Sequence, residues 1–379
     1  MFNLTRSRMF AMKTAVMPLL AVSAMVFLAP VRSAAQTPAP GTAAKSTAAA
    51  KPAKYTPPRM ADGRPDFSGF WSSSTATPLQ RPDSFGGREF LSPEEVAAFE
   101  LSTRRNDDDR VKGAPCVAQI TNSNCAPSVG GPRGGPGGVG DYNAVFFEDW
   151  KKVVPTLRTS IITDPKDGKV PPFTPEARMK VEAAREYQRT HVYDGPENLS
   201  NMDRCLTGNQ AGPPILPGGY NNTLHIVQTG SHVVIAAETI HDVRIVPMDG
   251  RPRDGIRQWL GETRGRWEGD TVVLETTTFN GRKNWFFTGD LGNTGARADE
   301  KMRVTERFTR TAPDILMYQF TVDAPGIFTK PWSGEIPMTL SKFPIFEYAC
   351  HEGNYSVPLI LSGARTQEKT AAARAGSGR

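Results

Sequence analysis

A short strand-like segment, AAETIHDVRIVPMDGR, carries four ionisable side chains within seven positions: Glu238, His241, Asp242 and Arg244. Side chains alternate along a strand, so in one continuous strand Glu238, Asp242 and Arg244 share a face and His241 lies on the other. Buried charges must be paired, so such a row in an interior predicts a site. His241 would move a proton, Glu238 or Asp242 would orient it or act as partner acid, and Arg244 would hold a developing anion. On an outer face the same row is a ladder of solvated ion pairs.

A second group of ionisable residues lies near the C-terminus, in the segment EYACHEGNY. His351 is a candidate general acid or base because imidazole titrates near neutral pH, and Glu352 is a candidate partner acid. A histidine in such a loop can equally orient the backbone by a hydrogen bond to a carbonyl oxygen. If Cys350 forms a disulfide with Cys205, this group lies beside the loop that contains Cys205.

Residues suited to hold a ligand occur at three further places, in the segments YNN, IRQWL and HEGNY. Aromatic rings and arginines bind aromatic or carboxylated molecules by stacking and by paired hydrogen bonds. The candidate substrate-binding residues are Tyr220, Asn221, Asn222, Arg257, Trp259 and Tyr355.

The spacing of the candidate metal ligands argues against a metal centre. Glu238, His241, His351 and Glu352 make a set of the kind that zinc or iron takes, but the sequence has no HExxH motif. In one strand Glu238 and His241 point to opposite faces unless a bulge intervenes. No GxSxG motif occurs either, which argues against a serine hydrolase. We expect neither a metal nor another cofactor.

Four cysteines, Cys116, Cys125, Cys205 and Cys350, predict two disulfides in an oxidising compartment, with three connectivities open. A local Cys116–Cys125 bridge would close a small loop and leave a long-range bridge between Cys205 and Cys350. Zinc coordination by thiolates is the alternative, but no CxxC spacing occurs and the cysteines are widely scattered.

The N-terminus has the three parts of a secretory signal peptide, namely basic residues, an apolar run and small residues before a cleavage point. We expect residues 1–35 to be removed, 36–59 to be a disordered Ala/Pro-rich linker, and the mature protein to be periplasmic or secreted with no membrane span. The removed part holds four basic residues and no acid, so the net charge falls from +6 to +2. No later basic block is interleaved with aromatic residues, so we expect no nucleic-acid partner.

The folded part, residues 60–365, reads as a single β-rich domain, followed by a disordered tail at 366–379. Ser92–Pro93 and Thr174–Pro175 are helix starts, the second of a helix that reaches about Thr190. From Tyr220 onward, short β-branched and aromatic runs alternate with tight turns, with no helical period between them. We predict a mainly β protein with a few N-terminal helices and an antiparallel meander that forms a barrel or a barrel-like sandwich. A barrel would allow a partly polar interior that holds a small ligand.

Five segments, DGRPDFSGFW, RTSIITDPKDGKVPPFTPEA, ETIHDVRIVPMDGR, RGRWEGDTVVLETTTFN and YACHEGNY, resemble the recurring blocks of a large exported bacterial protein family common in soil bacteria and sphingomonads. The resemblance spans nearly the whole folded part. It implies export, and a weak link to the breakdown of aromatic compounds, but no assigned catalytic residues.

Two classes of function follow from these residues. The first is a cofactor-independent lyase, isomerase or hydrolase that acts on a small aromatic or apolar molecule through a histidine and a carboxylate. The second is a non-catalytic periplasmic protein that binds a small molecule or associates with the envelope. An enzyme requires the carboxylates and a histidine to converge, whereas a binding protein requires only an aromatic cavity. The oligomeric state is not determined by the sequence.

Overall fold

A computed structural model describes residues 55–101, 152–208, 210–218, 220–282 and 300–377, all of which belong to one compact unit. The predicted signal peptide, most of the predicted linker and the predicted Cys116–Cys125 bridge lie outside the described residues. Among the described residues, no helix is both long and apolar enough to cross a membrane.

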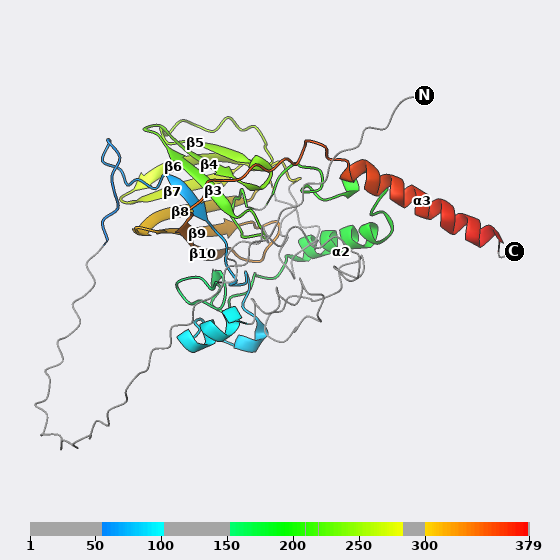
Figure 1. Ribbon diagram of the computed structural model, residues 1–379, viewed down its shortest axis with the longest axis horizontal. Coiled ribbons are helices and arrows are strands. Elements are labelled where there is room, and N and C mark those ends of the chain that lie inside the picture. The colour runs from blue at the N-terminus through cyan, green and yellow to red at the C-terminus, as the bar shows by residue number, and fades with distance from the viewer. Residues whose placement is uncertain (1–54, 102–151, 209, 219, 283–299, 378–379) are drawn as a thin grey trace, which may run out of the picture. The chain divides into compact units, whose positions relative to one another are not determined.

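The fold is a ten-stranded, mostly antiparallel sheet, shown in Figure 1. Its strands are β1 (Gly69–Ser72), β2 (Ile162–Asp164), β3 (Thr223–Gln228), β4 (His232–Ala237), β5 (Val243–Pro247), β6 (Glu262–Glu268), β7 (Thr271–Thr277), β8 (Arg303–Ala312), β9 (Ile315–Asp323) and β10 (Trp332–Leu340). Along the sheet the order is β5-β4-β3-β1-β10-β9-β8-β7-β6, and β2 pairs with β10 outside this path.

Tight turns join neighbouring strands where the sequence predicts them. Gly230 and Ser231 separate β3 from β4, Gly269 and Asp270 separate β6 from β7, and Pro313–Asp314 separates β8 from β9. The predicted meander is therefore confirmed for β3 to β5 and for β6 to β10. The short strand β1 is inserted between β3 and β10, and this long-range pairing has no local signal in the sequence.

The two edge strands, β5 and β6, approach each other and nearly close the sheet into a barrel. Gly265 of β6 lies at this seam, where an added Cβ would overlap the sulfur of Met248 and lie 3.1 Å from Cγ1 of Val246. A side chain at position 265 would therefore push the edge strands apart. The prediction of a barrel or barrel-like sandwich is confirmed in the form of this nearly closed barrel.

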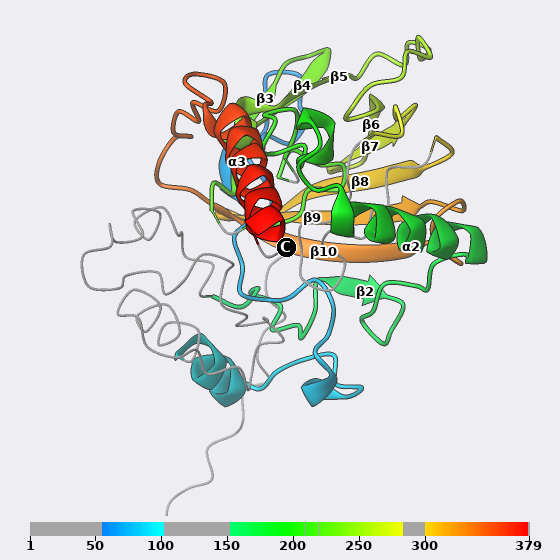
Figure 2. The ribbon, with the colours of Figure 1, turned by 90° about the vertical axis from the view of Figure 1, so that its right-hand side faces the viewer.

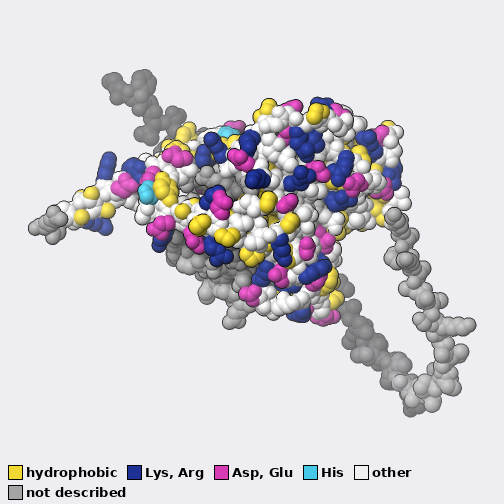
Figure 3. All heavy atoms as spheres, turned by 180° about the vertical axis from the view of Figure 1, so that it is seen from behind, with side chains coloured by type: hydrophobic (Ala, Val, Ile, Leu, Met, Phe, Trp, Pro, Cys, Tyr) yellow, Lys and Arg dark blue, Asp and Glu magenta, His cyan; other side chains and the backbone are white. Residues whose placement is uncertain are grey.

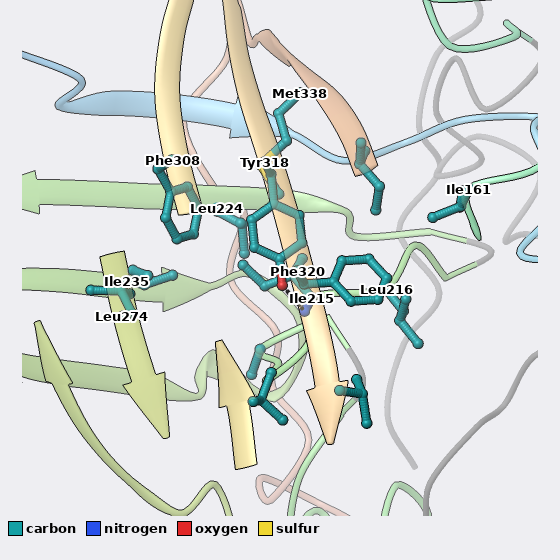
Figure 4. Close-up of a cluster of buried hydrophobic side chains, with 14 of the residues drawn as sticks. Ile161, Ile215, Leu216, Leu224, Ile235, Leu274, Phe308, Tyr318, Phe320 and Met338 are labelled. Atoms are coloured by element: carbon teal, nitrogen blue, oxygen red, sulfur yellow. Dashed lines mark hydrogen bonds between the residues drawn. The ribbon is translucent and has the colours of Figure 1, made fainter. Parts of the chain in front are cut away.

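The barrel interior is packed by side chains of the alternating inward face. Val304, Glu306 and Phe308 of β8 are buried, as are Leu316 and Tyr318 of β9, in agreement with the predicted alternation. Figure 4 shows part of this cluster, in which aromatic and aliphatic side chains from different strands face one another. Burial of such apolar surface is the main term that stabilises the barrel.

Helices are α2 (Pro175–Thr190), residues 93–101, and α3 (Ser356–Ser377), with short 3-10 turns at Asp83–Phe85, Pro196–Asn198 and Thr239–His241. Both predicted N-terminal helices are present, and the hydroxyls of Ser92 and Thr174 accept hydrogen bonds from the backbone of Glu95 and Ala177. These are N-cap contacts.

The predicted disordered tail is wrong for residues 366–377, because α3 continues through them. These residues include several alanines, the residue type with the highest helix propensity. Helix α3 is exposed along most of its length, and Figure 2 shows it obliquely, with its C-terminal end marked. On the face shown in Figure 3, acidic and basic side chains are interspersed, so no field of one sign forms there.

Candidate functional site

The segment with four ionisable groups is not one strand, and the prediction that its charges share a face is wrong. Strand β4 ends at Ala237 and β5 begins at Val243, so the segment is an antiparallel hairpin with a turn at residues 238–242. The turn contains Glu238, His241 and Asp242, whereas Arg244 lies in β5 opposite Ile235. Arg244 is therefore separated from the other three.

The turn is held in an unusual backbone conformation. Ile240 and His241 have φ angles of 58° and 45°. These values lie in the left-handed region, which residues other than glycine rarely adopt. Two neighbouring segments do the same, at Cys205 (φ 52°) and Asn221 (φ 55°). Such conformations persist where surrounding contacts impose them, and they concentrate at functional sites. The residue types of this segment favour a continuous strand, so the sequence has no local signal for this turn.

Glu238 is buried at the start of the turn, with 2% of its surface exposed. Its Oε1 accepts a hydrogen bond from Nδ2 of Asn221, and its backbone N–H donates to the carbonyl of Thr223 at 3.0 Å. Burial raises the pKa of the Glu238 carboxyl, and hydrogen bonds from Asn221, the backbone of Phe346 and the Thr223 hydroxyl partly offset that rise. Glu238 therefore joins the hairpin to two other segments.

Asp242 anchors the loop that follows Cys205. Its Oδ2 accepts hydrogen bonds from the hydroxyl of Thr207 at 2.9 Å and from the backbone N–H of Gly208 at 3.1 Å. The predicted ligand residue Asn222 anchors the other end of the same loop, because its Oδ1 accepts from the N–H of Gly218 at 2.6 Å. Both residues act by positioning this loop.

The disulfide Cys205–Cys350 is present and spans 145 residues of sequence. It attaches the C-terminal segment 341–355 to the loop that Asp242 anchors. Asn354 strengthens the attachment, since its Nδ2 donates to the carbonyl of Asp203 at 3.0 Å and lies 3.1 Å from Sγ of Cys205. The long-range bridge predicted from the cysteine count is therefore confirmed.

The bridge brings two histidines from distant parts of the chain together. The ring centroids of His241 and His351 are 6.1 Å apart, and both side chains are exposed. Nδ1 of His241 lies 3.2 Å from the carbonyl oxygen of Tyr348. Because a carbonyl only accepts, Nδ1 must carry the proton, which leaves Nε2 of the neutral ring as a base directed away from this contact. We call Glu238, His241, Asp242, His351 and the disulfide Cys205–Cys350 the rim cluster.

The remaining predicted residues are divided between this cluster and other places. Glu352 and Tyr355 are exposed and follow His351 in the same pinned segment. Tyr220 precedes Asn221 and its carbonyl accepts from the side chain of Gln210 at 3.2 Å. Arg257 and Trp259 lie in the connection between β5 and β6, where Arg257 pairs with Glu300 at 2.9 Å. No contact joins that pair to the rim cluster in the described residues.

Arg244 belongs to a second polar group, inside the barrel, which we call the interior triad (Arg244, Glu306 and Tyr318). Nη1 and Nη2 of Arg244 donate to Oε2 and Oε1 of Glu306 at 2.5 and 3.0 Å, and the hydroxyl of Tyr318 donates to Oε1 at 2.9 Å. All three side chains are buried. Burial and the Glu306 carboxylate hold the pKa of Tyr318 well above its usual range.

Our sequence reasoning missed Glu306 and Tyr318 as site residues. A signal was present, because Glu306 alternates with Val304 and Phe308 and thus places a carboxylate on an otherwise apolar face. Arg244 is likewise a charged residue on a buried strand face, between Val246 and the hairpin turn. Only the register across the five strands that separate β5 from β8 in the sheet shows that the two charges meet.

The segment 210–218 lies next to this triad. Ile215 and Leu216 are buried in the core cluster, and the backbone N–H of Ile215 donates to the hydroxyl of Tyr318 at 2.8 Å, as Figure 4 shows. Asp242 of the rim cluster binds Gly208 at one end of this segment, and Asn222 binds Gly218 at the other.

No protein-family model, curated protein or solved structure matches this chain.

Proposed function

We propose that the protein is an exported enzyme that performs cofactor-independent acid–base chemistry on a small aromatic or apolar molecule at the rim cluster. The observation that carries the proposal is the approach of His241 and His351 to 6.1 Å from positions 110 residues apart in sequence. Two imidazoles at this separation can act on one bound molecule, one as base and the other as acid.

The proton acceptor is Nε2 of His241, since Nδ1 faces the Tyr348 carbonyl. His351 then supplies the proton to the departing or rearranging group. The role of Glu238 and Asp242 is positioning. Glu238 fixes the Phe346 backbone two residues before Tyr348, and Asp242 fixes the loop that carries Cys205.

The apolar character of the substrate is supported by the exposed side chains of the same segments. Val243 follows Asp242, Phe346 precedes Tyr348, and Tyr355 follows His351, with 50%, 59% and 71% of their surfaces exposed. A contiguous exposed apolar patch rimmed by polar groups is typical of a ligand site, whereas apolar side chains that are exposed singly are ordinary. We assign the ring of the substrate to this apolar surface.

The test is incubation of the mature protein with a panel of aromatic dimers and sugar derivatives, followed by mass spectrometry. Turnover of any compound should fall by about 10²- to 10⁴-fold in His241→Ala and in His351→Ala, as for loss of a general acid or base. His191→Ala is the matched control, because His191 is the C-cap residue of α2, outside the rim cluster, and its loss should leave turnover unchanged. A panel in which nothing is consumed, or full activity in both variants, would refute this role.

A further inference from the structure

The two histidines of the rim cluster are spaced as two ligands of one metal ion. Bonds from a metal to histidine nitrogen are about 2.0–2.1 Å long. Two imidazoles on one ion therefore have ring centroids about 5 Å apart at a tetrahedral angle and about 6.4 Å apart on opposite sides of the ion. The 6.1 Å between the ring centroids of His241 and His351 lies within this range. The 59° between the two ring planes is also compatible, because each ring can turn about its bond to the metal.

The hydrogen bond that His241 makes to the backbone prepares its ring to be a ligand. Nδ1 lies 3.2 Å from the carbonyl oxygen of Tyr348 and carries the proton, so the lone pair is on Nε2. Histidines that bind metals almost always donate their other ring N–H to a carbonyl, a carboxylate or water, which fixes the tautomer and the ring orientation. The side chain of His351 is exposed, and within the described part of the chain no hydrogen bond from the protein engages its ring nitrogens.

Both rings are held from the same short segment, residues 205–208. Asp242, the neighbour of His241, accepts two hydrogen bonds from this segment. Cys350, the neighbour of His351, is joined to the first residue of the segment by the disulfide. Ligands that are already held near one another lose little conformational freedom when an ion binds between them. The two histidines are therefore a preorganised pair.

The chemistry of these two ligands selects the ion. Neutral imidazole suits Cu²⁺, Ni²⁺ and Zn²⁺, whereas Mg²⁺ and Ca²⁺ prefer oxygen ligands, and a given nitrogen site binds Cu²⁺ most tightly. No group of three or more His, Cys, Asp or Glu side chains that could hold a metal occurs among the residues that the structure describes. Water or a bound molecule therefore supplies the remaining ligands, in contrast to a closed structural site with four protein ligands.

We propose that His241 and His351 together form a binding site for one Cu²⁺ ion, at which Zn²⁺ binds more weakly. The ion takes the lone pair on Nε2 of His241, which is the proton acceptor in the proposed acid–base chemistry. Binding of the ion therefore blocks that chemistry and takes no part in it. This effect on turnover rests on the proposed function, whereas binding of the ion does not.

The test is titration of the full chain with Cu²⁺, Zn²⁺ and Mg²⁺ in separate calorimetric experiments without substrate, at about pH 7.5, where an ordinary imidazole is neutral. We expect one Cu²⁺ to bind with a Kd on the order of 1–100 µM. Zn²⁺ should bind about tenfold more weakly, and Mg²⁺ should not bind. The electron paramagnetic resonance spectrum of the Cu²⁺ complex should show two nitrogen ligands. No binding of Cu²⁺ at about 1 mM, or binding of Mg²⁺ as tight as that of Cu²⁺, overturns the proposal.

Three single variants locate the ion. His241→Ala and His351→Ala should each weaken Cu²⁺ binding at least about tenfold, since changes outside the ligands alone cost about 10–100-fold in affinity. Both side chains are exposed, so both variants should keep the fold, which circular dichroism checks. His191→Ala, at the C-cap of α2, should bind Cu²⁺ as the wild type does. If either rim variant binds Cu²⁺ with wild-type affinity, the ion is not held between the two histidines.

The same ion separates the metal site from the proposed chemistry. If the panel of aromatic dimers and sugar derivatives yields a substrate, turnover should fall at the Cu²⁺ concentrations at which calorimetry shows binding. Undiminished turnover with the ion bound would refute the role of His241 as base, while the calorimetry and the nitrogen count would still establish the site. Loss of Cu²⁺ binding in neither rim variant would refute the site, while the effect of these variants on turnover would still test the chemistry.

Discussion

Arg244 and Glu306 form a two-contact ion pair inside the barrel, 62 residues apart in sequence and with no more than 3% of either side chain exposed. A buried pair of this kind contributes little net stability, because removal of both charges from water offsets most of their attraction. Removal of one charge and removal of both charges should nevertheless differ in their effect on stability, and that difference can be measured.

Arg244→Met should lower the free energy of unfolding by about 3–5 kcal/mol, because it leaves the Glu306 carboxylate buried without its cation. The double variant Arg244→Met, Glu306→Leu should recover most of that loss. Urea unfolding of the two variants and the wild type measures both values. A double variant as unstable as the single one would show that the pair is itself strongly stabilising.

Tyr318→Phe should lower the free energy of unfolding by about 1–3 kcal/mol. It removes the hydroxyl that accepts from the Ile215 N–H and donates to Glu306, and both of these partners stay buried. Tyr355→Phe is the matched control, since the Tyr355 side chain is 71% exposed and should change stability by a few tenths of a kcal/mol at most. Thermal and urea unfolding measure the difference. Equal effects of the two substitutions would contradict the described role of Tyr318.

The raised pKa of Glu238 predicts a pH dependence of stability. The folded protein holds this proton more tightly than the unfolded chain, so the contribution is complete below the ordinary value of 4.5 and is lost as the pH rises through the folded value. Glu238→Gln has no such proton. The melting temperature of the wild type relative to Glu238→Gln should therefore fall as the pH rises from 4.5, and a constant difference between pH 4 and 7 (roughly the span over which a shifted carboxyl titrates) would show that folding leaves this pKa unchanged.

Replacement of both Cys205 and Cys350 by Ser should lower the free energy of unfolding by about 2–4 kcal/mol, since the bridge closes a long loop in the unfolded chain. The same double variant should lose turnover at the rim cluster, because it frees the segment that carries His351. Denaturant unfolding and the panel assay measure the two effects separately. Wild-type turnover in the double variant would show that the bridge does not position the histidines.

Local patterns were sufficient for most of the fold. Tight turns, alternating β-branched residues and helix caps are short-range signals, and they predicted the strands, the N-terminal helices and a barrel-like sheet. The hairpin turn at Glu238 was missed because its left-handed residues include Ile240, a type that favours extended strands. The helix at residues 366–377 was missed because a chain end is usually disordered, although its alanines favour a helix.

The candidate site was predictable only in its parts. The cysteine count allowed the Cys205–Cys350 bridge as one of three connectivities, and that bridge placed His351 beside the loop that contains Cys205. The approach of His351 to His241 was not predicted. The partner of Arg244 did not, because Glu306 meets it through the register of a sheet that closes on itself. Single-strand alternation shows which face a residue occupies, but not which residue it faces across a barrel.

The disulfide makes residues 205–350 a covalent ring that contains eight of the ten strands, β3 to β10. Strand β1 lies outside that ring, yet it is hydrogen-bonded to both β3 and β10. The sheet within the ring therefore has a gap one strand wide between β3 and β10. Strand β1, from an earlier part of the chain, fills this gap. Excision of residues 55–72 would expose two facing edges in the middle of the sheet and leave a cyclised fragment prone to capture a strand from another molecule.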